Sequence, residues 1–430
     1  MDPFIRTTNN ELLIIGGGAA GLMAAYHLLK AGKTVTLLEA ADRAGGRIHT
    51  VRQQGYALPV ELGPEFVHGN LPLTSGLLEK AGLHKLPIEG NFYRVENGRW
   101  LPMEEIVDGW DQLLQEMAGL AQDMPLQDFL DQYYAAPEQA RLRKEIEYYA
   151  QGFDVADLAR VSVKGLWKEW TAEENDNRKI REGYGRMIDY LLSECRSMGL
   201  QLHTGCIVKE LHWEAGKVQA STADGRQFVA AKAIVTVSLG VLQSEAGIAA
   251  IRFSPALDSW RKAATGLGFG NVIKFQLFFK QAFWQEEQAD AAFAISWEAI
   301  PTWWTSSPFR DAMLTGYIGG GLADQLSGRD KPALLALALQ SLSGIFGKSL
   351  DELKALLVDA RITDWRQEPL TLGAYSYPTV GAGDCIAQLK TPVADTVYFA
   401  GEAVYEGGHP GTVEAALTSG QQVVERILRQ

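Results

Sequence analysis

The feature that most constrains the fold is a glycine-rich turn, Gly16-Gly-Gly-Ala-Ala-Gly21, which directly follows the apolar stretch Leu12 to Ile15. After the turn, the apolar pattern predicts a helix from about Ala20 to Ala31 and a second strand from Thr34 to Leu38. A strand, a tight turn, a helix and a second strand make a βαβ unit. The chain is therefore expected to be an α/β protein with a Rossmann-like sheet.

Each glycine of this turn has its own role if the turn binds a dinucleotide. Gly16 permits the tight turn, Gly18 lets the backbone approach a pyrophosphate, and Gly21 lets the helix pack closely on the strand. The pyrophosphate would lie at the helix N-terminus, at Ala19 and Ala20, where free N–H groups and the helix dipole favour an anion.

An acidic residue ends the second predicted strand. Glu39, with Ala40 next to it, follows the first glycine by roughly 20 residues, the spacing of a carboxylate that holds ribose hydroxyls. Together with the turn, this carboxylate predicts dinucleotide binding. It disfavours a 2′-phosphate, but it does not separate NAD from FAD.

Composition excludes several other classes of protein. The 430 residues are 47% hydrophobic and 21% charged, which is typical of a globular chain, and the net charge of −12 makes nucleic acid an unsuitable partner. The three cysteines, Cys195, Cys206 and Cys385, are too far apart for a disulfide framework or a zinc site, so no metal is expected. Met1 to Asn10 contain no apolar leader, and no run of about 18 apolar residues occurs. We expect a cytoplasmic protein without a membrane span.

Elements of nucleotide-binding type recur in the middle and at the end of the chain. Further strands are predicted at Ala233 to Val237, Val272 to Phe279 and Val397 to Ala400, with a final helix from about Thr412 to Leu428. Between them lie long helical patterns around Glu104 to Ala121, Leu126 to Ala150 and Lys331 to Asp359. We therefore predict a discontinuous dinucleotide-binding domain (9–72, 184–264 and 371–430) with an interleaved α+β substrate domain (73–183 and 265–370).

A family becomes visible in Leu38-Glu-Ala-Ala-Asp-Arg-Ala-Gly-Gly-Arg-Ile-His-Thr50. This stretch resembles the signature of flavin amine oxidases, which include the monoamine and polyamine oxidases. The resemblance implies a flavoprotein of the GR2 type with FAD as the cofactor. It also implies that Gly45 and Gly46 let the chain pass close to the FAD pyrophosphate and that Arg47 neutralises it.

Further segments resemble the family in the same order along the chain. They are Glu61-Leu-Gly-Pro-Glu-Phe-Val-His-Gly69, Ala233 to Leu242 (with Ser238 in place of a proline), Asp364-Trp365 before Gly373-Ala-Tyr-Ser376, and Phe399-Ala-Gly-Glu402 before Gly411-Thr-Val-Glu-Ala-Ala-Leu417. The resemblance implies further FAD contacts at Gly63, Pro64, Glu65, Val208, Trp365, Gly401, Glu402, Thr412 and Val413. The last two open the final helix, whose N-terminus would stabilise negative charge on the reduced flavin.

Lys274 is the first candidate for the chemistry. In the strand from Val272 to Phe279, alternation places Lys274 and Gln276 on one face and four apolar side chains on the other. Alternation alone favours a lysine that points into water. The flanking sequence, however, resembles that of the family's active-site lysine, which implies that Lys274 holds a water against flavin N5.

The second candidate is Tyr375, which the resemblance makes one wall of an aromatic cage that steers the amine towards the flavin. At the opposite wall this chain has Thr412 where monoamine oxidases have an aromatic residue. Ala374 stands where mammalian monoamine oxidases carry the cysteine that links the flavin. We therefore expect FAD to be bound non-covalently.

Candidates for the substrate cavity are His68, Glu65, Glu182 and Thr412. The preferred hypothesis is an oxidase that converts a primary or secondary amine (a monoamine or polyamine) to an imine by hydride transfer to the flavin, with O2 reduced to hydrogen peroxide. An L-amino acid oxidase is an alternative, in which Arg178 or Arg181 would hold the carboxylate. A related desaturase or protoporphyrinogen oxidase is a second alternative. The sequence does not determine the amine, the physiological electron acceptor or the oligomeric state.

Overall fold

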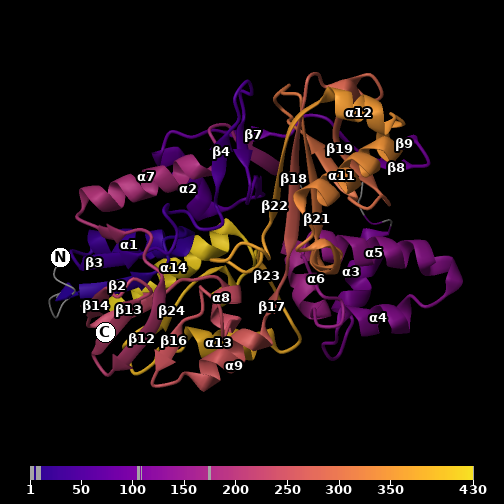
Figure 1. Cartoon of the computed structure of the whole chain (residues 1–430). Coiled ribbons are helices and arrows are strands. Elements are labelled where there is room, and N and C mark those ends of the chain that lie inside the picture. The colour runs from indigo at the N-terminus through magenta and orange to yellow at the C-terminus, as the bar shows by residue number, and fades with distance from the viewer. Residues whose placement is uncertain (1–3, 6–10, 104–106, 108, 173–175, 430) are drawn as a thin grey trace.

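The computed structural model describes residues 4–5, 11–103, 107, 109–172 and 176–429. Figure 1 shows two lobes, and helices from opposite ends of the chain, α1 (Ala19–Lys30) and α14 (Val413–Leu428), lie side by side in one of them. The predicted strand, turn and helix at the start of the chain are confirmed. The predicted final helix is confirmed too, with Thr412 as its N-cap.

The lobe that holds α1 is built on a five-stranded parallel sheet. Its strand order is β11-β3-β2-β15-β24, and each neighbouring pair is parallel. The strands are β2 (Glu11–Ile15), β3 (Thr34–Leu38), β11 (Gln201–His203), β15 (Lys232–Val235) and β24 (Val397–Phe399). All of them except β11 were predicted, and their observed bounds differ from the predicted ones by two residues at most.

Strand β2 is buried on both faces, which explains its continuous apolar sequence. Leu12 and Ile14 pack against helices, whereas Leu13 and Ile15 pack against a second sheet, because successive side chains point to opposite faces. The helices are α1, α2 (Pro72–Lys80), α7 (Tyr184–Ser197) and α14, and the second sheet consists of β1 (Phe4–Ile5), β14 (Gln227–Ala230), β13 (Lys217–Thr222), β12 (Val208–Glu214) and β16 (Arg252–Ser254).

The other lobe is built on a seven-stranded sheet, in which β18 is the second strand from one edge (Figure 1). Its neighbouring strands are antiparallel except for the parallel pair β19 and β8. In order, the strands are β22 (Leu357–Asp364), β18 (Val272–Phe279), β21 (Met313–Gly319), β20 (Thr302–Thr305), β19 (Ala291–Ser296), β8 (Asn91–Glu96) and β9 (Arg99–Pro102).

The predicted alternation of β18 is confirmed, but both of its faces are buried. Phe275 and Leu277 pack with helix α11 (Lys331–Phe346) in one apolar core. On the opposite face, Lys274 and Gln276 are 3% and 1% exposed. Lys274 therefore does not point into water, and its ammonium group must find partners inside the protein.

The remaining elements fill the space around these sheets. A helical cluster, α3 (Trp110–Ala118), α4 (Leu126–Tyr133), α5 (Ala140–Gly152) and α6 (Val163–Ala172), lies beside α10 (Gly320–Leu326). The chain also forms three short sheets: β6 (Phe66–His68), β10 (Asn177–Ile180) and β7 (Lys85–Pro87); β4 (Thr50–Arg52) and β5 (Pro59–Glu61); and β17 (Gly268–Phe269) and β23 (Ser376–Tyr377). Three further helices are α8 (Leu239–Gln243), α9 (Asp258–Gly266) and α13 (Ala382–Lys390).

Two of the long helical patterns are interrupted. The stretch 126–150 divides into α4 and α5 at a short 3-10 turn that begins at Pro137, because proline starts helical turns well but does not continue them. The stretch 331–359 divides at Gly347, whose left-handed φ of 65° ends α11, and Ser349 then caps α12 (Leu350–Leu356). Residues from Leu357 onward join β22. Of the pattern 104–121, positions 104–106 and 108 lie outside the described residues.

All five strands of the parallel sheet come from the segments predicted for the dinucleotide-binding domain, and all seven strands of the larger sheet come from the substrate segments. Two strand pairings cross this division, because β10 pairs with β6 and β17 pairs with β23. The boundaries stay a prediction. Within the described residues no single helix is long and apolar enough to span a membrane; α11 and α12 meet the criterion only together, bent by 111°.

Candidate active site

A cavity of about 1070 Å³ is lined by residues of both lobes. Gly18 and Glu39 of the first βαβ unit line it, and so do Lys274 of β18 and Tyr375. Segments at the start, middle and end of the sequence therefore meet at one space, which is larger than needed for a dinucleotide's phosphates alone.

The glycine turn has the geometry that a pyrophosphate requires. A Cβ at Gly21 would lie 2.0 Å from the carbonyl oxygen of Gly16, which has a φ of +111°, so neither position accepts a side chain. A Cβ at Gly18, in contrast, would meet nothing within 4 Å, because this glycine faces the cavity. Helix α1 begins directly after it, at Ala19, so the free N–H groups of its first turn lie at the same wall.

Glu39 is held in place by backbone N–H groups. Its carboxylate accepts hydrogen bonds from Gly17 N at 2.6 Å and from Ala41 N at 2.7 Å. Burial raises the pKa of Glu39, and these backbone hydrogen bonds oppose the rise. Each carboxylate oxygen keeps a lone pair that can accept a hydrogen bond from a ribose hydroxyl.

The Gly45-Gly46-Arg47 segment runs beside the glycine turn. Gly45 N donates to Gly17 O at 2.8 Å, and a Cβ at Gly46 would lie 3.4 Å from the Cα of Gly18. The Nη1 of Arg47 donates to Ala374 O at 2.6 Å and to Glu402 Oε1 at 2.8 Å. The buried carboxylate of Glu402 therefore fixes the guanidinium at the cavity wall.

The other residues predicted to bind the cofactor are distributed around the same wall. Of the predicted cofactor-binding residues, Gly21 alone does not line the cavity, because it is packed against Gly16. The predicted residues that line the cavity are Gly16, Gly18, Ala19, Ala20, Glu39, Ala40, Gly45, Gly46, Arg47, Gly63, Pro64, Glu65, Val208, Trp365, Gly401, Glu402, Thr412 and Val413. The donors and the open glycine backbone therefore fit a dinucleotide such as FAD.

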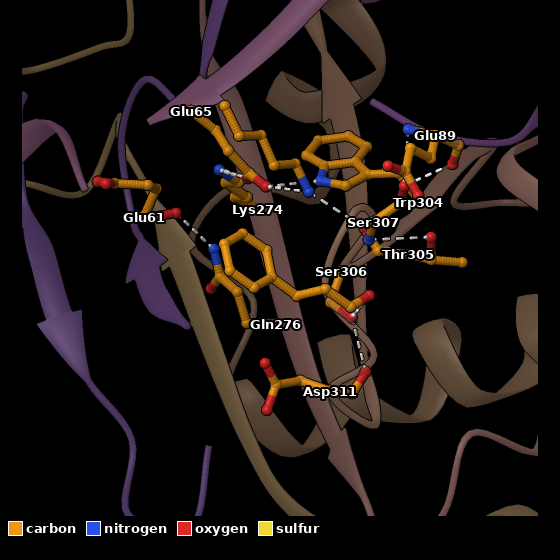
Figure 2. A network of polar contacts seen from close by, with 12 residues as sticks. Glu61, Glu65, Glu89, Lys274, Gln276, Trp304, Thr305, Ser306, Ser307 and Asp311 are labelled. Atoms are coloured by element: carbon orange, nitrogen blue, oxygen red, sulfur yellow. Dashed lines mark hydrogen bonds and ion pairs between the residues drawn. The ribbon is translucent and has the colours of Figure 1, made fainter. Parts of the chain in front are cut away.

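Lys274 is bound at the cavity wall by a carboxylate. Its Nζ donates to Glu65 Oε2 at 2.6 Å and to Gly63 O at 3.2 Å. Figure 2 shows the Lys274 and Glu65 side chains directed at one another, with the Trp304 indole beside them. Glu65 Oε1 accepts hydrogen bonds from Trp304 Nε1 at 3.0 Å and, in an ion pair, from Lys179 Nζ at 3.0 Å.

These contacts correct the interpretation of Glu65 as a substrate-binding carboxylate. Burial on its own would raise the pKa of Glu65, but the ammonium groups of Lys274 and Lys179 lower it to about 2. Both oxygens of this ionised carboxylate already accept hydrogen bonds from nitrogen donors of the protein. Glu65 therefore orients Lys274, and its negative charge is already balanced by two ammonium groups of the protein, which leaves it little net charge to attract a substrate ammonium.

Tyr375 presents a rigid ring to the cavity. Its hydroxyl donates to Phe153 O at 2.6 Å and lies 2.8 Å from the hydroxyl of Tyr317. Burial and the neighbouring Tyr317 raise its pKa well above the usual range, so the hydroxyl stays protonated. A Cβ at Gly411 would lie 3.0 Å from Cδ2 of Tyr375, so the chain passes the ring where only glycine fits.

Thr412 is not the second wall of a cage. Its hydroxyl donates to His409 O at 2.8 Å and accepts from Ala415 N at 3.1 Å, as the N-cap of α14 does. The side chain is therefore committed to starting the helix, although the residue lines the cavity.

The remaining substrate candidates separate into one inside and one outside the cavity. His68 lines it; its Nδ1 lies 2.5 Å from Asn177 Oδ1, and burial lowers its pKa, which favours the neutral ring. Glu182 does not line it. Glu182 instead accepts hydrogen bonds from the backbone N and the Nδ1 of His84, at 3.0 and 2.9 Å, so the structure gives no support to the substrate role predicted for it.

Sequence reasoning missed most of the substrate end of the cavity. Arg94 and the buried Glu145 form an ion pair of 2.8 Å in the wall. Lys179 was not identified, because no motif surrounds it. Trp110, Trp170, Trp297 and Trp304 of the substrate segments line the cavity. The aromatic residues of this wall are Phe66, Phe92, Trp110, Tyr148, Tyr149, Phe153, Trp170, Phe293, Trp297, Trp304 and Tyr317.

The cavity has few features of a metal site. No group of three or more His, Cys, Asp or Glu side chains that could hold a metal ion occurs in the described part of the chain. Cys206 lines the cavity beside Glu39, and burial raises the pKa of its thiol to about 11. The groups that line this wall include the ammonium of Lys274, the carboxylate of Glu65 and the ring of Tyr375.

Comparison with known proteins agrees with this arrangement. The family described as flavin containing amine oxidoreductase matches residues 19–428. Polyamine oxidase 2 of Arabidopsis thaliana is 27% identical over 98% of this chain and 88% of its own length. A lysine-specific histone demethylase 1 homolog 3 of the same plant is 26% identical over 97% of this chain, which spans only 30% of that protein.

Solved structures share the fold. Cyclohexylamine oxidase from Brevibacterium oxydans IH-35A has a TM-score of 0.81 at 20% identity and covers 98% of this chain and 99% of its own. Putrescine oxidase bound to putrescine has a TM-score of 0.79 at 19% identity and covers all of both chains. Because these identities are low, the likeness establishes the fold alone.

The buried Glu61 next to the site generates a prediction on stability. Its carboxylate accepts from Thr50 Oγ1 and Tyr184 N, at 2.7 and 2.8 Å, yet burial raises its pKa from 4.5 to about 7. The folded state therefore holds this proton more tightly than the unfolded chain, and the stabilisation is lost as pH rises from about 4.5 through 7. For Glu61→Gln, the free energy of unfolding should fall less than in wild type between pH 5 and 8, by up to about 3 kcal/mol.

Urea unfolding at several pH values between 5 and 8 measures this difference. Glu79→Gln, on the exposed surface of α2, is the matched control. Parallel stability curves for wild type and Glu61→Gln would contradict the prediction.

Proposed function

The chain belongs to the flavin-containing amine oxidoreductase family, and from this premise we propose that it oxidises a primary or secondary amine to an imine. It is an FAD-dependent oxidoreductase that acts on amines. When bound, FAD would supply the acceptor for the hydride of the amine Cα and the route of the electrons to O2, which would give hydrogen peroxide. The protein's own part is to bind, orient and control charge.

Different parts of the cavity wall would hold different parts of FAD. The glycine turn and the start of α1 would bind the pyrophosphate together with Arg47, and Glu39 would accept hydrogen bonds from the ribose. The N-terminus of α14, at Val413, would face the flavin, where the helix dipole stabilises negative charge.

The observation that carries the proposal is the Lys274 ammonium at the same cavity as the glycine turn. An ammonium has three N–H donors, and Lys274 uses two of them, on Glu65 and Gly63. Among the described residues its Nζ has no third hydrogen-bond partner, so one donor remains for a water or ligand in the cavity. The ring of Tyr375, fixed through its hydroxyl, provides an aromatic face for the amine.

We further propose that the amine carries an apolar body. Aromatic side chains dominate the wall near β8 and β19, where the Phe92 and Phe293 rings stack at 4.4 Å. The carboxylates Glu65 and Glu145 in the wall are already paired with lysines or arginines. A second ammonium on the substrate would lose its hydration there without gaining a dedicated carboxylate partner from either of them.

The arrangement gives less support to an amino acid substrate. Arg178 pairs with Asp176 at 2.9 Å, and neither Arg178 nor Arg181 lines the cavity. Arg94 does line it, but its Nη1 pairs with Glu145.

A panel of amines tests the proposed activity. Cyclohexylamine and benzylamine should bleach the flavin band near ~450 nm anaerobically and should do so at least about tenfold faster than putrescine or spermidine, which carry a further charge that must be desolvated. A peroxidase-coupled assay should then detect hydrogen peroxide in air. Faster reaction with putrescine would contradict the apolar body, and no bleaching with any amine would contradict the oxidase.

Replacement of the lysine tests its role directly. Lys274→Met should bind FAD but slow flavin reduction or reoxidation about tenfold or more, because the donor that faces the cavity is removed. Stopped-flow absorbance separates these two half-reactions. Lys280→Met, at the exposed position just after β18, is the matched control. Rates in Lys274→Met equal to those of wild type would refute the assignment.

Ala374 generates a prediction on how the cofactor is attached. It lines the cavity, and its carbonyl accepts from Arg47 Nη1, but its methyl side chain cannot form a thioether. The cysteine in the wall, Cys206, lies beside Glu39, and burial raises the pKa of its thiol to about 11, so it is a weak nucleophile. Acid precipitation should release all yellow colour into the supernatant. Colour that stays with the pellet would show a covalent link.

A further inference from the structure

Glu65 bridges two buried lysines that come from different strands. Its Oε2 binds Lys274 of β18 at 2.6 Å, and its Oε1 binds Lys179 of β10 at 3.0 Å. The three side chains are only 10%, 4% and 7% exposed. We call Glu65, Lys179 and Lys274 the cluster. With one carboxylate and two ammonium groups, its net charge is +1.

Lys179 is placed behind the wall. It does not line the cavity; its Nζ also donates to Thr305 O at 3.2 Å and lies 5.4 Å from the Phe66 ring centre. It thus cannot touch a substrate, and one carboxylate would have sufficed to pair Lys274. Burial lowers the pKa of Lys179, which shows that placing a second ammonium here is costly. What Lys179 adds to the wall is charge.

We propose that Glu65 and Lys179 are positioning residues: they fix the Lys274 ammonium at the cavity wall and keep the cluster at +1, so that the cavity binds the reacting amine in its uncharged form. Oxidation needs this form, because the nitrogen lone pair must assist loss of the hydride. A typical alkylamine in water at neutral pH is an ammonium ion. The inference rests on the amine oxidase activity proposed above.

A positive charge near the bound nitrogen repels a second positive charge. For a unit charge at roughly 10 Å and an effective dielectric constant of about 20, the repulsion lowers the pKa of a bound amine by about one unit. The cluster thereby shifts the protonation equilibrium of the bound amine about tenfold towards the uncharged form. The Lys274 donor left over from Glu65 and Gly63 faces the cavity and needs an acceptor, which a water in the cavity provides, so that the lone pair of the neutral amine stays free.

Other titratable groups surround the cluster and the cavity. Glu61 of β5 interacts electrostatically with both Lys274 and Glu65, and burial raises its pKa to about 7. Because Glu61 would then change its charge within the pH range of the measurements, the experiment uses a variant that lacks this carboxylate. Burial lowers the pKa of His68, which leaves that ring neutral near pH 7 and above. The other titratable groups that line the substrate side are Arg47 with Glu402, Arg94 with Glu145, Tyr148, Tyr149, Glu169, Tyr317, Tyr375 and His409.

The test changes the cluster charge in a Glu61→Gln background. Lys179→Met lowers the charge from +1 to 0, whereas Lys179→Met combined with Glu65→Gln returns it to +1 without the bridging carboxylate. Lys179→Arg keeps both charge and bridge, and Lys33→Met, on the exposed surface, is the matched control. If Lys179→Met loses its FAD, Lys179→Gln replaces it in both arms.

The first measurement is independent of turnover. tert-Butylamine has no Cα–H and cannot be oxidised, so calorimetry in buffers of different ionisation enthalpy counts the protons released when it binds. Near pH ~9.5, where a shift of about one pKa unit leaves roughly half of the bound amine uncharged, the reference protein should release roughly 0.4 proton per amine, and Lys179→Met should release clearly fewer. Lys179→Arg and the double variant should behave like the reference. Equal proton release in the reference and Lys179→Met would overturn the proposal.

The second measurement is the pH dependence of flavin reduction by cyclohexylamine. The acid midpoint should rise by about one pH unit in Lys179→Met and return in the double variant. A purely structural role predicts instead that the double variant is at least as impaired as Lys179→Met, and that result would overturn the proposal. Absence of any reduction in wild type would reject the amine oxidase itself, whereas reduction with identical midpoints in all variants would reject only the charge effect.

Discussion

The candidate site depends on one buried ion bridge that joins the two lobes. Lys274 belongs to the seven-stranded sheet, whereas Gly63 and Glu65, which accept its hydrogen bonds, belong to the segment that follows the glycine turn. Removing one partner of such a buried pair typically costs about 3 to 5 kcal/mol, because the other charge is left uncompensated. The same bridge therefore holds β18 against the cofactor segment and fixes an ammonium at the cavity wall.

Local physics made the first βαβ unit predictable. The Gly16 to Gly21 turn leaves few alternatives, because one glycine needs a positive φ, another leaves no room for a Cβ, and a third faces open space. The alternation of β18 likewise placed Lys274 and Gln276 on one face correctly. Alternation could not tell what covers that face, because the cover comes from 211 and 215 residues away, at Gly63 and Glu61. Periodicity describes an element and not its neighbours.

The errors at the site have the same origin. Glu65 and Glu182 looked alike in sequence, as single acidic residues near recognisable motifs. In the structure Glu65 is enclosed by Lys274, Lys179 and Trp304, whereas Glu182 pairs with an exposed His84. Tertiary partners decide whether a carboxylate binds a ligand, orients a lysine or lies at the surface, and here the strand pairing of β10 with β6 brings Lys179 to Glu65. No short-range signal encodes that pairing.

The net charge of −12 shows why overall composition is a poor guide to a cavity. An acidic protein attracts cations over distances up to about the Debye length, roughly 8 Å at physiological ionic strength. Inside the cavity several carboxylates are already committed to donors of the protein: Glu39 to backbone N–H groups, Glu65 to two lysines, Glu145 to Arg94 and Glu402 to Arg47. The surface can therefore draw an ammonium towards the protein, while the buried lysines favour its neutral form at the point of reaction.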